Sequence, residues 1–174
     1  MTPRPWTWPL FTLPRETWVL PVGKGAFGAK RKHDVHTGVD LYCPNGTPVQ
    51  ALTVGRVIKV VDFTGKKAGS PWWEDTQAVL VDSFDNGVRF GSILYGEMTV
   101  DPWVIPGALV KYGGRIGRVK RVLKKDKGKP TAMLHVELYT PGFVGDPVEW
   151  LLGKRKPRVL LDPTPELRRI LEGK

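Results

Sequence analysis

The sequence predicts an all-β domain, an antiparallel β sandwich or barrel that ends in one short helix. Short segments rich in β-branched and aromatic residues alternate with Gly, Pro and Asn along most of the 174-residue chain. Little helical periodicity separates these segments, which argues against a parallel sheet with crossover helices. Asn86-Gly87, between two alternating segments, is typical of a two-residue hairpin turn.

The expected strands follow one another from residue 17 to residue 139. They are Thr17–Leu20, Val39–Tyr42, Pro48–Leu52, Gly55–Asp62, Gln77–Asp82, Val88–Tyr95, Arg115–Val122 and Met133–Tyr139. Turn residues separate most of them, and Asn45-Gly46 is a second tight-turn signal. Spacing of this kind favours strands that pair with their neighbours in one antiparallel domain.

The only expected helix lies at the C-terminus. Thr164 can cap it, and Pro165 suits its first helical position. An apolar stripe at helical spacing would dock it on the domain, and its members are Leu167, Ile170 and Leu171. We therefore expect three parts: an N-terminal arm over 1–16, a β domain over 17–150 and a basic C-terminal extension with the helix over 151–174.

Composition is that of a globular domain, with 41% apolar and 25% charged residues. No apolar run approaches the roughly 18 to 20 residues that span a bilayer. The first residues lack an apolar h-region, so we expect synthesis in the cytoplasm without a secretory signal. Phage-type release or a virion would then deliver the protein to an outside target. Cys43 is the single cysteine, which excludes an internal disulfide and a cysteine-based zinc site.

The net charge of +10 comes from 27 Lys and Arg against 17 Asp and Glu. Much of the excess lies in Lys111–Lys129 and Lys154–Arg158. Such a balance favours polyanionic partners: nucleic acid, an anionic cell wall or a membrane surface. A solvated basic face without a partner is the alternative. Gly23–Gly28 formally matches a dinucleotide-binding motif, but no helix is expected after the glycines, so we interpret the match as accidental.

A candidate metal site begins at His36-Thr37-Gly38-Val39-Asp40. In a strand, positions 36 and 40 point to the same face, and Gly38 between them leaves room for an ion. Met133–Tyr139 alternates strictly, which puts His135 on the face opposite its apolar residues. Two imidazoles and one carboxylate suit zinc and leave its fourth position for water, as a catalytic site requires.

In their order and spacing, several stretches resemble the LytM/lysostaphin family of zinc endopeptidases. They are His36-x-Gly38-x-Asp40, Pro44-x-Gly46-Thr47-Pro48-Val49, Gly55-x-Val57, Val110–Gly117 and Leu134-His135-Val136-Glu137, with Asp146-Pro147 after them. The resemblance implies a LytM-like all-β fold that hydrolyses peptide bonds of bacterial peptidoglycan. It also implies one Zn²⁺ held by His36, Asp40 and His135. Phage-encoded lytic or tail proteins are similar in size and charge.

Two positions depart from the family pattern. Met133 stands where the family usually has the first histidine of His-x-His, and Glu97 stands where a catalytic histidine follows Tyr95 by two. A carboxylate can take a proton from water, so we interpret Glu97 as the general base. D-Ala-D-Ala-type zinc peptidases, with a Glu base, are similar in this respect. Alternation puts Glu97 on the face of Tyr95 and Ile93. His33, Tyr95 or a basic side chain would have to replace Met133 beside the oxyanion.

Three interpretations of function remain. The intact ligand set favours an active endopeptidase, whereas the loss of both auxiliary histidines would suit an inactive wall-binding or structural virion protein. A basic β-barrel that binds nucleic acid is the third, with Trp72-Trp73 available for stacking. We expect peptidoglycan as the partner, with virion proteins as further candidates, and neither nucleic acid nor a membrane span. Glu137 either orients His135 or is a plain surface carboxylate.

Overall fold

Nine β-strands form the sheet of this computed structural model, which describes residues 6–173. They are β1 Val39–Tyr42, β2 Pro48–Gln50, β3 Val54–Thr64, β4 Thr76–Asp85, β5 Val88–Val100, β6 Leu109–Val110, β7 Arg115–Val119, β8 Met133–Tyr139 and β9 Leu160–Leu161. Every pairing between them is antiparallel. The all-β prediction is therefore confirmed, including the one α-helix at the C-terminal end of the described chain, α1 Thr164–Glu172.

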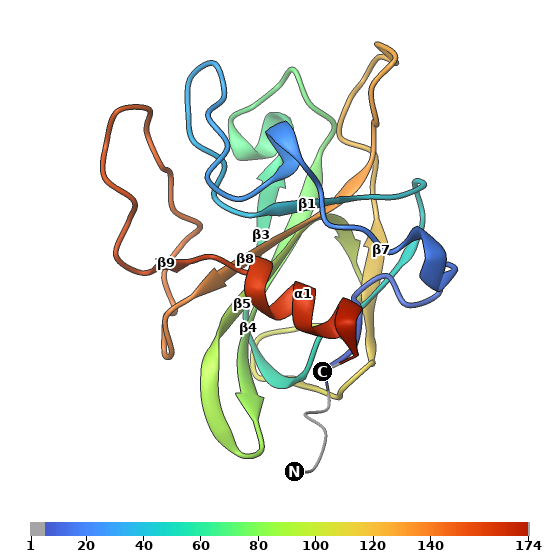
Figure 1. Cartoon of the computed structure of the whole chain (residues 1–174), viewed down its shortest axis with the longest axis vertical. Helices are drawn as coiled ribbons and strands as arrows, with labels where there is room; N and C mark the ends of the chain where they lie inside the picture. Colours follow the sequence, from blue (N-terminus) through green and yellow to red (C-terminus); the bar gives the residue numbers. More distant parts are fainter. Residues whose placement is uncertain (1–5, 174) are drawn as a thin grey trace.

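The sheet runs in the order β1-β8-β5-β4-β3-β6, and β5 connects two parts of it (Figure 1). Residues Ser92–Gly96 of β5 pair with β8, whereas Met98–Val100 pair with β7. β4 lies along the other edge of β5, and its register shifts between Gln77 and Val79, opposite this change of partner. A bulge at Gly96 and Glu97 therefore marks the point where β5 leaves one partner and joins the next.

The hairpin between β4 and β5 confirms the strongest turn prediction. Asn86 and Gly87 both have positive φ, at 50° and 79°. Two consecutive positive φ values define the turn whose twist matches that of paired strands, and Asn-Gly adopts it at little steric cost. The hairpin projects at the lower edge of Figure 1, away from β1.

Two apolar clusters cover the two faces of the sheet. The main core includes alternate residues of β8 and β5, together with Trp8 and Leu10 of the N-terminal segment. The second cluster is formed by Ala78, Leu80, Leu94, Tyr139 and Leu160, which lie beneath aromatic residues of the connecting loops. As a result, all seven residues of β8 are buried, whereas the alternating pattern predicts one apolar and one polar face.

The C-terminal helix docks through its expected stripe, since Leu167 is buried and Ile170 and Leu171 pack against the main core. Its cap differs from the prediction. Thr164 is the first helical residue rather than the cap, and its backbone N–H donates to Asp162 Oδ1 at 2.8 Å. The carboxylate two residues upstream thus satisfies a free helical N–H.

The expected strand Thr17–Leu20 is wrong. A 3₁₀ turn at Arg15–Thr17 occupies its start, and the segment forms no ladder. Trp18 stacks on Trp8 with ring centroids 5.7 Å apart, and its indole N–H donates to the Leu13 carbonyl. Packing of Trp18 on Trp8, which lies in the described part of the N-terminal arm (residues 6–16), therefore replaces strand pairing in the segment 17–20. Among residues 6–173, no helix has the length and apolar character needed to cross a membrane.

Candidate metal centre

The structure brings together the three residues that the sequence singled out as ligands. Asp40 on β1 lies opposite His135 on β8 in the strand register, and His36 precedes β1. One potential ligand atom from each residue lies within 4.8 Å of the others, and all three residues are buried. His36 Nε2 is 3.1 Å from His135 Nδ1, and these nitrogens lie 3.0 and 2.8 Å from Asp40 Oδ1. Such a group could hold a metal ion.

Hydrogen bonds on the outer side of each imidazole define which nitrogen faces the centre. His36 Nδ1 lies 3.0 Å from the Ala26 carbonyl oxygen, and His135 Nε2 lies 2.9 Å from Glu137 Oε1. Both partners are acceptors, so the protons belong on these two nitrogens. His36 Nε2 and His135 Nδ1 therefore face Asp40 Oδ1, and with these two nitrogens unprotonated the three atoms would be acceptors around a shared cation.

Arg31 completes this outer set. Its Nη2 donates to Asp40 Oδ2 at 2.7 Å and to the Lys24 carbonyl at 3.0 Å. Because Oδ2 is engaged here, Oδ1 is left for the centre. Burial would raise the pKa of Asp40, but hydrogen bonds from His135 and His36 outweigh it and hold that pKa well below its usual range. Sequence patterns predict only an unspecified basic side chain beside the oxyanion, and they do not identify Arg31 as the partner of Asp40.

Glu137 is an orienting partner and not a surface carboxylate. It is 1% exposed, accepts a hydrogen bond from Thr37 Oγ1 at 2.5 Å and from the Tyr139 hydroxyl, and faces His135 Nε2. Burial alone would raise its pKa, yet the bond to His135 and its other partners lower it. A buried carboxylate with this many donors stays ionised and fixes the imidazole. In the metal-free chain, hydrogen bonds to Asp40 and Glu137 overcome the opposing effect of burial and raise the pKa of His135 to about 10.

Close packing also positions His135. A Cβ added to Gly38 would lie 2.4 Å from the Val136 carbonyl oxygen and 2.8 Å from the His135 ring. Only glycine leaves this space, which the Val136 carbonyl and the His135 ring occupy, whereas the sequence predicted room for an ion beside Gly38. On the other side, the Phe63 ring lies 5.4 Å from the His135 ring, between centroids.

Glu97 lies at the bulge of β5, where its φ is +62°. The bulge inserts an extra residue between Tyr95 and Met98, both of which face the main core. The prediction that Glu97 shares a face with Tyr95 and Ile93 is therefore wrong. Regular alternation does not hold across a bulge, and such bulges often redirect a side chain. Glu97 is redirected toward the face that carries Asp40 and His135.

The surroundings of the Glu97 carboxyl raise its pKa. Burial, followed by the charge of Asp40, raises its pKa to about 8, while His135 and Arg31 oppose the shift. Its Oε2 is buried and has no hydrogen-bond partner within residues 6–173. Buried polar atoms in folded proteins nearly always have a partner, and exceptions are frequent at functional sites.

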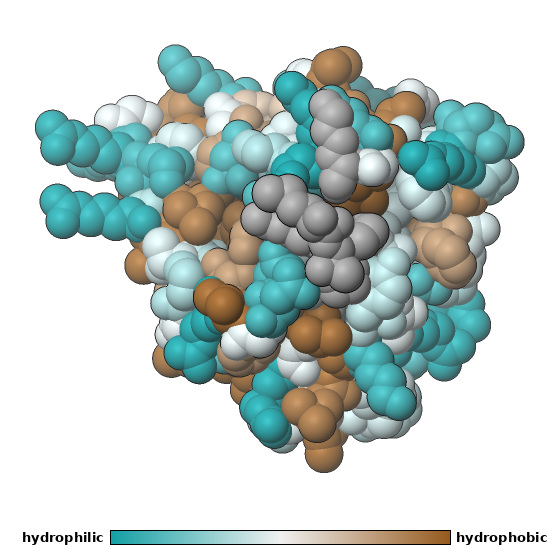
Figure 2. Space-filling model, turned by 60° about the horizontal axis from the view of Figure 1, so that its bottom comes forward, coloured by the Kyte–Doolittle hydropathy of each residue, from teal (hydrophilic) through white to brown (hydrophobic). Residues whose placement is uncertain are grey.

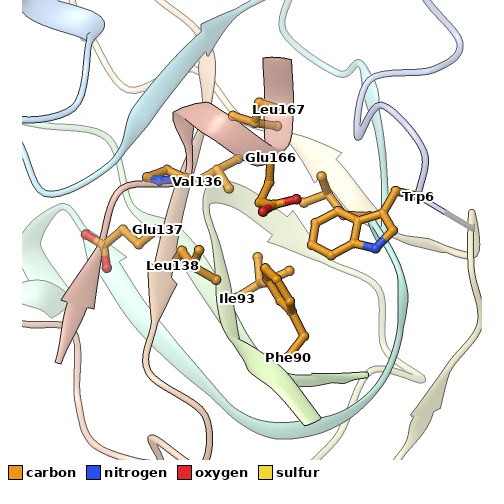
Figure 3. Close-up of a pocket in the computed structure, with 10 residues that line it drawn as sticks. Trp6, Phe90, Ile93, Val136, Glu137, Leu138, Glu166 and Leu167 are labelled. Carbon is orange, nitrogen blue, oxygen red and sulfur yellow. The ribbon is translucent and has the colours of Figure 1, made fainter. Parts of the chain in front are cut away.

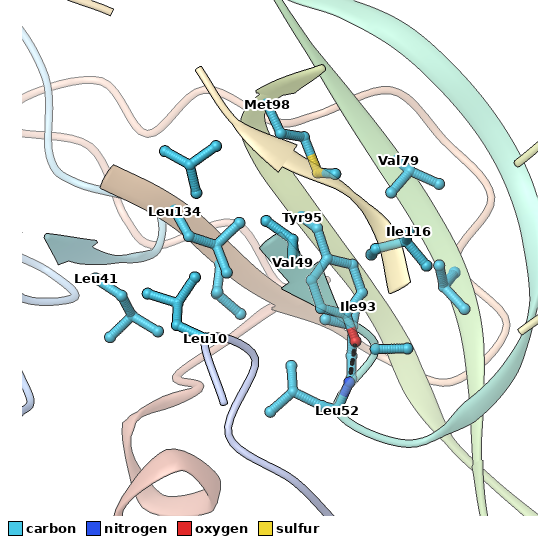
Figure 4. Packing of buried hydrophobic residues seen from close by; sticks show 14 of the residues in the cluster. Leu10, Leu41, Val49, Leu52, Val79, Ile93, Tyr95, Met98, Ile116 and Leu134 are labelled. Carbon is cyan, nitrogen blue, oxygen red and sulfur yellow. Dashed lines mark hydrogen bonds between the residues drawn. The ribbon is translucent and has the colours of Figure 1, made fainter. Parts of the chain in front are cut away.

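The other candidates lie outside the centre. Figure 4 shows Tyr95 inside the main core, where its hydroxyl accepts a hydrogen bond from the Leu52 N–H at 2.9 Å. His33 is exposed in the loop before β1, and Met133 is 9% exposed and carries no donor. Of the candidates named to replace the missing histidine, only a basic side chain, Arg31, contacts a ligand.

Two sequence features and one pocket contribute no side chain to the centre. The glycines of Gly23–Gly28 form a 3₁₀ turn and a loop rather than the start of a helix, in agreement with an accidental match. Burial raises the pKa of the Cys43 thiol to about 11, so it stays protonated. A small apolar pocket lies below α1 on the core side of β8, lined by Val136, Leu138 and Leu167 among others, and the Glu137 carboxylate points away from it (Figure 3).

The fold is similar to that of known peptidase domains. The catalytic domain of the antimicrobial peptidase lysostaphin from Staphylococcus simulans matches with a TM-score of 0.55 and 20% identity, over 88% of this chain and 95% of that domain. Whole lysostaphin matches with a TM-score of 0.56 and 20% identity, over 92% of this chain, which spans about half of that protein (54%). A variant of the catalytic domain of the prophage-encoded protein EnpA from Enterococcus faecalis matches at 0.53 and 22% identity, over 84% and 88%. No family model and no curated protein match the sequence. The chain thus has the lysostaphin-type peptidase fold, as the resemblance implied.

Proposed function

We propose that this protein is a zinc-dependent endopeptidase that hydrolyses peptide bonds of bacterial peptidoglycan. The observation that carries the proposal is the convergence of His36, Asp40 and His135, each held from outside by its own partner, beside a buried carboxyl without a partner. The lysostaphin-type fold and the ordered motifs support a peptidase and its wall substrate.

The donor set fits zinc. Tetrahedral zinc with bonds of about 2.0–2.1 Å separates its ligand atoms by roughly 3.3 Å. The three atoms here lie 2.8–3.1 Å apart, so outward shifts of a few tenths of an ångström would admit the ion. His36 Nε2, Asp40 Oδ1 and His135 Nδ1 would hold it. Zinc bound there would polarise the scissile carbonyl and make a neighbouring water more acidic.

Glu97 is the proposed general base. Its carboxyl lies close enough to Asp40 and His135 for their charges to change its pKa, and its Oε2 has no partner among the described residues. The carboxylate would take a proton from the attacking water and then give it to the leaving amine. A pKa of about 8, close to neutral pH, suits both steps, because the same group must accept and release a proton.

Arg31 would position Asp40, and Glu137 would position His135. Neither residue need touch the substrate for this role, since both bonds lie on the outer side of the ligands. Partners of this kind fix the ring or carboxylate orientation and commonly contribute 10–100-fold, as an order of magnitude, to metal affinity.

An inactive wall-binding or structural virion protein is the second candidate. The observation that favours it is Met133, which lies two residues before the ligand His135 on β8 and offers no hydrogen bond to a developing oxyanion. Such a protein would retain the metal and bind the wall without cutting it.

The test compares purified peptidoglycan treated with the wild type, with Glu97→Gln and with the control Glu16→Gln. The carboxyl of Glu16 is exposed and lies far from Glu97 in the sequence. We expect one zinc per chain in all three proteins and loss of about 10²–10⁴-fold of wall-cleaving activity in Glu97→Gln alone. Zinc with no activity in the wild type would favour the second candidate. Activity that survives Glu97→Gln would refute the assignment of the base.

A further inference from the structure

The net positive charge of the protein comes from four loops. These rim loops are residues 24–34, 65–75, 120–132 and 140–158. They contain sixteen of the 27 Lys and Arg but only six of the 17 Asp and Glu, so they account for the whole net charge of +10. The rest of the sequence holds eleven residues of each sign and is neutral overall.

The rim loops contact one another in two pairs. Asp34 bridges to Leu151, and the Phe27 and Trp150 rings lie 5.8 Å apart, which joins 24–34 to 140–158. Trp73 bridges to Leu123, which joins 65–75 to 120–132.

Two of the three proposed ligands follow a rim loop closely in the sequence. The loop 24–34 leads directly to His36, and 120–132 leads through Ala132 and Met133 to His135. Three of the loops form the upper edge of Figure 1, and 140–158 lies beside them. Figure 2 brings the opposite, lower side forward, where hydrophobic and hydrophilic residues alternate.

The cation nearest the ligands is held rigidly. Lys30 and Val35 form a β-bridge, and the Arg31 N–H donates to the Asp34 carbonyl at 2.8 Å, so the basic segment is a small hairpin. The Arg31 guanidinium is anchored by Asp40 and Lys24, and its Nη1 has no hydrogen-bond partner in the described chain. Its side chain is 36% exposed. A fixed guanidinium with a free edge is suited to a carboxylate.

We propose that the rim loops recognise free carboxylates on the peptide that enters the centre, which selects anionic stem peptides of peptidoglycan over neutral glycine cross-bridges. The proposal rests on the proposed function and names its substrate class. Lys30 and Lys32 flank Arg31 in the sequence and are exposed, so they add positive charge next to a carboxylate bound there. Salt screens such charges over about 8 Å.

The binding test uses zinc-loaded Glu97→Gln protein and cross-linked muropeptides whose stem carboxylates are either free or converted to amides. A pentaglycine peptide serves as the neutral probe. Titration calorimetry should give a Kd about tenfold lower for the free carboxylates than for the amides, because charge-assisted hydrogen bonds exceed neutral ones by roughly this amount. Equal Kd values, or preference for pentaglycine, would overturn the proposal.

A double variant locates the effect. Changing both Lys30→Gln and Lys32→Gln should reduce the carboxylate preference at least about threefold through loss of two nearby charges. The matched control, Lys111→Gln with Arg168→Gln, removes two exposed cations outside the rim loops and should leave the preference unchanged. An equal loss in both double variants would contradict recognition by the rim.

Two further outcomes separate this proposal from others. If the carboxylate preference persists in binding but the wild type cleaves neither muropeptide, the hydrolytic function fails and the recognition stands. If the wild type cleaves both forms with equal kcat/KM and binds them equally, hydrolysis stands and the recognition fails. Tighter binding of a short oligonucleotide, with a steep dependence on salt, would assign the rim to phosphates instead and overturn the proposal.

Discussion

On one face of β8, Leu134, Val136 and Leu138 are 0–6% exposed and pack into the main core; on the other face, His135, Glu137 and Tyr139 are 0–5% exposed and bond to one another. Burial is therefore the same on both faces, while the forces differ. The apolar face gains free energy from removal from water and from dense packing, neither of which requires a particular direction.

The polar face loses free energy unless each buried atom finds a partner in the right direction. Glu137 meets this requirement with three partners, and His135 meets it with Glu137 at Nε2 and Asp40 at Nδ1. The contrast indicates that the apolar face of β8 stabilises the fold, whereas its polar face positions the residues of the centre. Substitutions on the two faces should separate stability from metal binding.

The largest expected effect is on the apolar face. Leu134→Ala should lower the free energy of unfolding by about 2–5 kcal/mol, because it removes fully buried methyl groups and leaves a cavity. Chemical denaturation measures this loss. The folded variant should still bind one zinc per chain. A loss below about 1 kcal/mol, or a folded variant without zinc, would break the comparison.

The next effect is on the polar face. Glu137→Gln should weaken zinc binding about 10–100-fold, since the charged acceptor that orients His135 is replaced by a neutral one. Competition with a chelator measures the affinity, and Glu149→Gln, which changes an exposed carboxyl, is the control. Unchanged zinc affinity with reduced stability would assign Glu137 to the fold alone.

A pH effect should distinguish Glu97 from both faces. Burial raises its pKa from the ordinary value of 4.5 to about 8, so the folded state binds the proton more tightly. The stabilising contribution is complete below about pH 4.5 and is lost as the pH rises through about 8. Metal-free wild type should therefore lose about 4 kcal/mol relative to Glu97→Gln between about pH 5 and pH 9. Parallel stability curves for the two proteins would contradict this pKa.

The smallest effect is expected at Tyr139. Tyr139→Phe removes a hydroxyl that donates to Glu137 and accepts a hydrogen bond from the Val148 N–H at 3.2 Å. The ring stays packed on Phe143, so the loss should be about 1 kcal/mol in thermal or chemical denaturation. A loss as large as that of Leu134→Ala would mean that the hydroxyl does more than satisfy its neighbours.

Much of this arrangement could be predicted from local patterns. Alternation predicted the bounds of β8, Asn86-Gly87 predicted the turn between β4 and β5, and the ordered motifs predicted that His36, Asp40 and His135 lie together. Each of these signals lies within a few residues or within a recognisable order along the chain, which is why sequence alone was sufficient.

The remaining features depend on contacts that a local pattern does not contain. Glu97 appeared to share the face of Tyr95 because the bulge of β5 arises from its change of partner between β8 and β7. Arg31 has no motif, and only the hairpin before His36 brings it to Asp40. Tertiary pairing sets both positions, so periodicity could not reveal them.

The central claim is that His36, Asp40 and His135 form one zinc centre. Its most direct test is the zinc content and zinc affinity of the purified wild type beside Asp40→Asn, a substitution of similar size on β1. We predict one zinc per chain in the wild type and at least about tenfold weaker binding in Asp40→Asn. A wild type that binds no zinc, or binds it equally well after Asp40→Asn, would contradict the account.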